Sequence, residues 1–207
     1  MVITYHGHQF FKLQYGDTVL ALDPPSADSE YKSARFGADI VLSSVRHPDF
    51  MGRENLTAGD KDPFIIYGPG EYEVQEIFIK GLSSKTQYDG DEGVNTIYYF
   101  NMEGMDILFL GALGSTNLDP EVLEVIDNVD VLFIPLGEEG VLDPVEAYKF
   151  GVKLEANIII PMHYNETQLG VFLKEEGTKK KKAEDKLTIK PSDVSGKEGE
   201  IIILSQS

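Results

Sequence analysis

The pattern of apolar and polar positions divides the chain into a β-rich first half and a mixed second half. In the first half, short runs of β-branched and aromatic residues are separated by turn residues such as Gly16-Asp17 and Gly68-Pro69-Gly70. Runs of this kind, partly alternating and bounded by turns, predict strands. The predicted strands of this half cover residues 2–5, 10–15, 18–22, 38–44, 64–67, 73–79, 96–100 and 105–110.

The second half alternates strands with helices. Asp119-Pro120 and Asp143-Pro144 each supply a helix-capping side chain followed by a proline at the first helical position, which predicts helices over 119–127 and 143–154. A third helix is predicted over 168–175, and the remaining strands over 131–135, 157–161, 187–190 and 200–204. Many strands followed by alternating strands and helices favour two sheets with helices on their outer faces. A chain of 207 residues suits one such domain, residues 1–207.

Charge and composition restrict the partners of this domain. With 42% hydrophobic and 26% charged residues, the chain has the composition of an ordinary globular protein. Its formal net charge of −17 repels phosphate backbones and predicts no nucleic-acid partner. The opening MVITYHGHQF lacks a basic and an apolar segment, and no apolar run is long enough for a membrane span, so we expect a cytoplasmic protein with no membrane partner. A small molecule or a protein remains as partner, and the edge strands of the β-rich half leave a homo-oligomer open.

The absence of cysteine limits the chemistry that the chain can carry. Disulfides and thiolate metal sites are excluded, because the chain has no cysteine. A metal ion would need imidazole and carboxylate ligands, and the chain has four histidines: His6, His8, His47 and His163.

Several segments, in order, resemble the metallo-β-lactamase superfamily, in particular its branch of small zinc-dependent hydrolases that includes ascorbate-6-phosphate lactonase-like proteins. The matching segments are ITYHGH at 3–8 with LDP at 22–24, GPGEYEV at 68–74, NTIY at 95–98, GALG at 111–114 and IPMHY at 160–164. The resemblance spans residues 1 to about 165 and implies a four-layer αββα sandwich, which mixes α/β and α+β features.

The resemblance also implies a metal site, and this chain departs from it. Members of the superfamily bind one or two ions through a His-x-His-x-Asp-His loop, a third histidine, a bridging aspartate and a last histidine. In the matching loop, SSVRHPDF at 43–50, Val45 and Phe50 stand where the resemblance implies two of the histidines. The third histidine would fall within 84–87, where the chain reads SKTQ, and Ala112 takes the place of the aspartate. A catalytic zinc normally has three protein ligands, so four losses predict an eroded site.

The surviving residues define the candidate site. His47, Asp49 and His163 are the candidate metal ligands, with Asp49 as the candidate catalytic residue, and the candidate binding cleft comprises His8, His47, Asp49, Glu138 and His163. Each also has a structural interpretation. His163 could bond a backbone carbonyl, and Asp49 could cap a helix near residues 50–52. His6 and His8 could pack on one face of the first strand, and Glu138 could belong to an exposed acidic loop.

Two functions follow, and a third concerns assembly. The first is a catalytically inactive protein that uses the cleft as a ligand-binding or interaction module, without a metal cofactor. The alternative is a metal-dependent hydrolase of the lactone or phosphoester class that works with a reduced single-metal site, holding zinc or manganese. The third is a structural role in self-association. We rank them in this order, because the lost ligands argue against catalysis.

Overall fold

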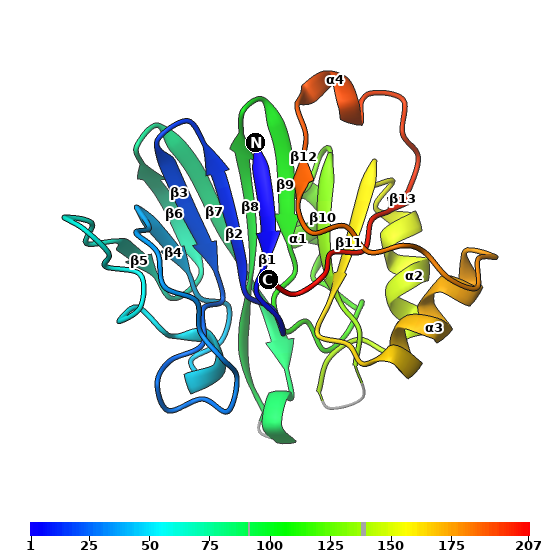
Figure 1. The fold of residues 1–207 in the computed structure, drawn as a ribbon. Coiled ribbons are helices and arrows are strands. Elements are labelled where there is room, and N and C mark those ends of the chain that lie inside the picture. Colours follow the sequence, from blue (N-terminus) through cyan, green and yellow to red (C-terminus); the bar gives the residue numbers. More distant parts are fainter. Residues whose placement is uncertain (91, 138–139) are drawn as a thin grey trace.

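The fold is built from two β-sheets that pack face to face (Figure 1). The structure, a computed structural model, describes residues 1–90, 92–137 and 140–207. The first sheet has the strand order β12-β1-β2-β3-β4-β5. Its strands are β1 (Val2–Tyr5), β2 (Phe11–Tyr15), β3 (Thr18–Leu22), β4 (Ile40–Leu42), β5 (Phe64–Ile66) and β12 (Leu187–Thr188).

The second sheet has the order β13-β11-β10-β9-β8-β7-β6. Its strands are β6 (Gly70–Val74), β7 (Ile77–Thr86), β8 (Gly93–Met102), β9 (Met105–Phe109), β10 (Val131–Pro135), β11 (Ile158–Met162) and β13 (Glu200–Ile201). Strands β6 to β9 pair antiparallel, whereas β9, β10, β11 and β13 pair parallel. Parallel strands buried on both faces are nearly continuously apolar, which explains the sequences VLFIP of β10 and IIIPM of β11.

The largest apolar cluster lies between the two sheets. Leu13 and Leu22 from the first sheet meet Phe109 and Phe133 from the second in this layer. The hydroxyl of buried Tyr98 in β8 donates to the carbonyls of Ser43 and Ile66, at 2.8 and 3.1 Å, and so ties the second sheet to loops at the ends of β4 and β5. The predicted sandwich is confirmed.

Helices cover only one of the two outer faces. Their bounds are α1 (Pro120–Val125), α2 (Pro144–Lys153), α3 (Glu166–Glu175) and α4 (Pro191–Val194), with short 3-10 turns η1 (Pro48–Phe50) and η2 (Tyr88–Gly90). Residues of α1, α2 and α3 pack on the second sheet. The outer face of the first sheet is covered instead by irregular segments that contribute Ala34, Phe36 and Leu56. No helix among the described residues is long and apolar enough to cross a membrane.

Several predicted elements differ from the structure in their bounds, and one differs in kind. The strand predicted over 73–79 is interrupted, because Gln75 and Glu76 adopt positive φ angles of 50° and 64° and form the turn between β6 and β7. Strand β7 then continues to Thr86, well beyond the predicted end.

Asp143 caps α2 as predicted, by accepting from the amides of Val145 and Glu146. Asp119 makes no such bond at the start of α1.

A buried aspartate fixes the loop that follows β4. Asp23, directly after β3, is fully buried and has a φ of 46°. Its carboxyl accepts from the backbone amide and the hydroxyl of Ser44, both at 2.6 Å. Burial raises the pKa of Asp23 to about 8, against the opposing effect of the Ser44 hydrogen bonds. Burial therefore favours the protonated form of this carboxyl.

We predict that the Asp23 proton makes stability fall as the pH rises. Between about pH 4, where an unfolded aspartate loses its proton, and pH 8, the folded state holds one proton more than the unfolded state. The free energy of unfolding should therefore decline across this window, by no more than about 1.4 kcal/mol per pH unit from this group. Urea denaturation at several pH values measures the slope.

The variant Asp23→Asn should remain folded and lose that part of the slope, because an amide keeps the shape of the protonated carboxyl without titrating. Asp17→Asn, at an exposed aspartate, is the matched control and should leave the slope unchanged. Parallel curves for Asp23→Asn and the unmodified protein would contradict the assignment.

Candidate functional site

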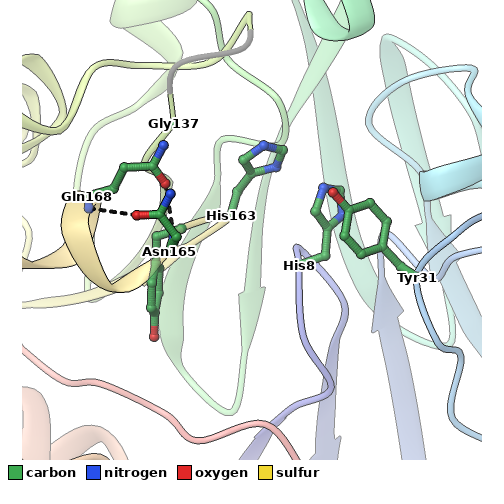
Figure 2. Close-up of a pocket in the computed structure, with 7 residues that line it drawn as sticks. His8, Tyr31, Gly137, His163, Asn165 and Gln168 are labelled. Carbon is green, nitrogen blue, oxygen red and sulfur yellow. Dashed lines mark hydrogen bonds between the residues drawn. The ribbon is translucent and has the colours of Figure 1, made fainter.

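The loops at one edge of the sandwich surround two neighbouring cavities. These loops follow β1, β3, β4, β7, β9, β10 and β11, and they gather at the lower edge in Figure 1. The cavities have volumes of about 380 and 450 Å³, and Tyr31 and His163 line both. We call the two cavities together the cleft. Figure 2 shows the first, with His8 and Tyr31 on one side and Asn165 and Gln168 on the other.

His163 stands at the end of β11 in a left-handed backbone conformation, with a φ of 55°. Its Nδ1 lies 3.0 Å from the amide group of Gln9. With the Gln9 amide turned so that its oxygen accepts from Nδ1–H, the amide nitrogen donates to the Gly111 carbonyl at 3.2 Å and to Asp23 at 3.1 Å. This orientation satisfies every neighbour, so we adopt it. It places the lone pair of His163 on Nε2, for which the described residues supply no hydrogen-bond partner.

His8 faces His163 from the other sheet. Strand β1 ends at Tyr5, and the positive φ angles of Gly7 and His8 turn the chain, so the prediction that His6 and His8 share one face of the strand is wrong. The His8 ring lies 4.4 Å from that of His163 and stacks on Tyr31 at 3.9 Å. His6 packs instead against Phe10.

Burial favours the neutral form of two of the cleft imidazoles, those of His8 and His163. Burial lowers the pKa of His8 to about 2, aided by the nearby His163 and His47. Burial also lowers the pKa of His163 to about 4, against the opposing charge of Asp49. Nδ1 of His8 is buried and has no hydrogen-bond partner among residues 1–90, 92–137 and 140–207. The cleft thus contains two uncharged rings with unused nitrogen atoms.

Asp49 forms a short hydrogen-bonded cluster with two hydroxyl groups. The Tyr88 hydroxyl donates to Oδ2 at 2.6 Å, and the Ser29 hydroxyl donates to Oδ1 at 2.5 Å. Burial and the Asp49 carboxylate raise the pKa of Tyr88 far above its usual value, so Tyr88 keeps its proton. The interpretation of Asp49 as a helix cap is wrong, because His47 caps η1 by accepting from the Asp49 amide at 3.3 Å.

Val45, Phe50 and Ala112, which stand where the resemblance implies metal ligands, belong to one apolar cluster. Phe50, Ala112 and Val141 are buried against one another, with Val45 and Tyr88 packed on them. Gly111 permits this approach, because a Cβ at that position would collide with the Cβ of Ser44. Val45, Phe50 and Ala112 therefore converge as the implied ligands would, but they offer carbon in place of nitrogen and oxygen.

The structure brings most of the predicted cleft residues together. His8, His47, Asp49 and His163 all line it, whereas Glu138 lies outside the described residues. In the described part of the chain, no group of three or more His, Cys, Asp or Glu side chains gathers in a way that could hold a metal ion. The donor set present there does not fit the metal centre that the resemblance implies.

Sequence analysis missed Gln9, Tyr31 and Tyr88. The Gln9 amide oxygen accepts from His163 and so orients its ring. The Tyr31 ring stacks on His8, and the Tyr88 hydroxyl donates to the Asp49 carboxylate. None of these residue types marks a site by itself. The one available signal was the position of Tyr88, directly after the stretch in which a histidine was expected.

Comparisons with known proteins agree with this fold. Residues 2–163 match the family model of the β-lactamase superfamily domain. A Bacillus cereus protein named a metal-dependent hydrolase is 25% identical over 198 residues, covering 80% of this chain and 86% of the relative. A similar protein of Bacillus mycoides is 24% identical over 197 residues, with the same coverage.

Solved structures show the same architecture. A Thermotoga maritima protein of the metallo-β-lactamase superfamily superposes with a TM-score of 0.77 at 27% identity, covering 98% of this chain and 97% of that one. A metallo hydrolase from Ignicoccus hospitalis superposes with a TM-score of 0.63 at 17% identity, covering 100% and 95%. The family model spans most of the chain, and this protein therefore belongs to the β-lactamase superfamily.

Proposed function

We propose that this protein uses the cleft of a metallo-β-lactamase fold to bind a small organic molecule, without the metal centre of the hydrolases that it resembles. The observation that carries the proposal is the apolar cluster of Val45, Phe50 and Ala112 at the positions of three implied ligands. A divalent ion needs electron-pair donors at these points, and carbon supplies none. Fold membership alone does not establish catalysis.

The cleft keeps the properties of a binding site. It has a preformed volume, stacked aromatic walls at Tyr31 and His8, and a few oriented polar groups. Such combinations are typical of small-molecule sites. The Asp49, Tyr88 and Ser29 cluster holds the loops after β3, β4 and β7 together, which gives the cleft a fixed wall.

The second candidate is a metal-dependent hydrolase with a reduced single-metal site, of the lactone or phosphoester class. The names of the relatives favour this candidate over an inactive protein, because they are metal-dependent hydrolases. Nε2 of His163 has no partner among the described residues, and Gln9 orients the ring by accepting from Nδ1–H. This arrangement also suits a metal ligand. Zinc or manganese would be held by His47, Asp49 and His163, with Glu138 as a further donor.

We also propose the broader properties that the sequence suggests. One domain over residues 1–207 is supported by the strand order, since β12 and β13 from late in the sequence pair with β1 and β11 in the two sheets. The net charge of −17 supports the absence of nucleic-acid partners, and a cytoplasmic location and a homo-oligomer are further proposals from the sequence.

Metal analysis of protein purified without chelator separates the two candidates. We expect less than about half an equivalent of zinc, manganese or iron, because three protein donors are not assembled in the described residues. The Bacillus cereus relative, purified in the same way, is the control for metal loss during preparation. Retention of one equivalent that the variant His163→Ala abolishes, together with hydrolysis of a lactone or phosphodiester, would establish the second candidate instead.

Restoring donors at the three apolar positions should create metal affinity. The triple variant Val45→His, Phe50→His and Ala112→Asp should bind zinc in calorimetry, because these positions already converge. Loss of the buried Phe50 ring should cost roughly 3–5 kcal/mol of stability, so unfolding is measured with zinc and with chelator.

A matched control places new histidines away from the cleft, at the exposed valines Val152 and Val171. That double variant should gain no zinc affinity. A triple variant that is folded and binds no more zinc than the control would show that the three positions do not mark the ancestral ligand sphere.

A further inference from the structure

The residues that line the cleft carry charge of one sign. Neither cavity is lined by a described lysine or arginine, whereas the second is lined by the carboxylates of Asp28, Glu30, Asp49 and Asp89. No ion pair within the described chain joins Asp28 or Glu30 to a lysine or arginine. On an acidic protein, exposed carboxylates alone identify no binding site. The aromatic and histidine side chains of the cleft are therefore needed to determine which class of ligand fits.

Aromatic rings form the second feature of the cleft. The Tyr31 side chain is 44% exposed and its ring lies flat on His8, as Figure 2 shows. Tyr88 stands edge-on to His163 at 5.7 Å and to His47 at 5.2 Å. Exposed tyrosine faces attract organic cations through the ring quadrupole, by about 0.5–2 kcal/mol.

Unused acceptors form the third feature. The mostly buried His163 ring has an unpaired Nε2 and lines both cavities. A neutral imidazole nitrogen of this kind accepts hydrogen bonds and donates none. The Asp49 carboxylate already receives two hydroxyl groups, so the charge of Asp28, Glu30 and Asp89 is left to attract a ligand from outside. A ligand that fills the cleft must therefore supply N–H donors and positive charge.

We infer that the cleft binds a small organic cation, with an ammonium group in the cavity that Tyr31 and Tyr88 line, its N–H donated to His163 Nε2, and its charge balanced by Asp28, Glu30 and Asp89. This inference names the ligand class of the proposed function and rests on it. An anionic ligand does not fit, because no described cationic side chain lines the cleft. A bare divalent ion does not fit either, because the described donors do not converge in threes.

Calorimetric titration with 1,4-diaminobutane tests the ligand class, and 1,4-butanediol is the uncharged control of the same shape. The diamine should bind and the diol should not, and added salt should weaken the diamine because exposed charges are screened. Tyr31→Leu should weaken the diamine by about 2- to 30-fold, whereas Tyr31→Phe, which keeps the ring, should retain most of the affinity.

Two distant control variants fix the location. Tyr15→Leu removes a tyrosine that is 50% exposed at the end of β2, and Glu121→Gln removes an exposed acid of α1. Neither should change the affinity, whereas Asp89→Asn should lower it; the Asp89 side chain is 73% exposed, so this variant should fold normally.

The outcomes distinguish this inference from the function on which it rests. Equal binding of the diol, or no binding of either compound, would overturn the organic-cation inference. So would equal effects of Tyr31→Leu and Tyr15→Leu. Binding of the diol within the cleft would leave the proposed small-molecule function standing, while stoichiometric zinc lost in His163→Ala would remove that function itself.

Discussion

The buried carboxyl of Asp23 is the contact on which the geometry of the cleft depends. It lies where β3 ends and holds both the amide and the hydroxyl of Ser44, where the loop after β4 begins. Through Gln9 the same carboxyl reaches His163 on the other sheet. One buried carboxyl thus helps to set the positions of the loop with His47 and Asp49 and of the turn with His163. A buried acid is tolerated there because its oxygens are hydrogen-bonded.

Around this carboxyl, the cleft loops are held together by apolar packing, which differs from the way loops are held in a metal site. In a metal site, loops converge because several donors share one ion. Here Phe50, Ala112 and Val141 converge because apolar surface is removed from water, and Tyr88 closes the cluster by donating to Asp49. Apolar packing of this kind holds the loops without any ligand. The architecture of the cleft loops is therefore stabilised by apolar contacts and hydrogen bonds among the described residues.

Much of the fold could be predicted from local patterns, because strands and capped helices carry their signals within a few residues. The strands β1 to β3 and the helix after Asp143 follow the predicted ranges closely. The turn at Gln75-Glu76 could not be predicted, since neither residue is a glycine, asparagine or aspartate that would mark a positive φ. The irregular cover of the first sheet was missed because the resemblance implied helices there.

The candidate site was predictable where it depends on family positions and unpredictable where it depends on tertiary contacts. His47, Asp49 and His163 were named from their place in matching segments, and they line one cleft. Gln9, Tyr31 and Tyr88 come from three separate loops, so their roles arise only when both sheets are assembled. The match of residues 2–163 to the superfamily domain shows the relationship that these segments indicate.

The backbone bond between the two cleft histidines has a mechanical consequence. His163 N–H donates to the carbonyl of His8 at 2.8 Å, and both residues hold left-handed backbone conformations that few other environments support. The bond spans the seam between the sheets, so neither turn can relax independently of the other. The same bond ties the turn that carries His8, under Tyr31, to the end of β11, so one wall of the cleft is joined to the other through the backbone as well as through side chains.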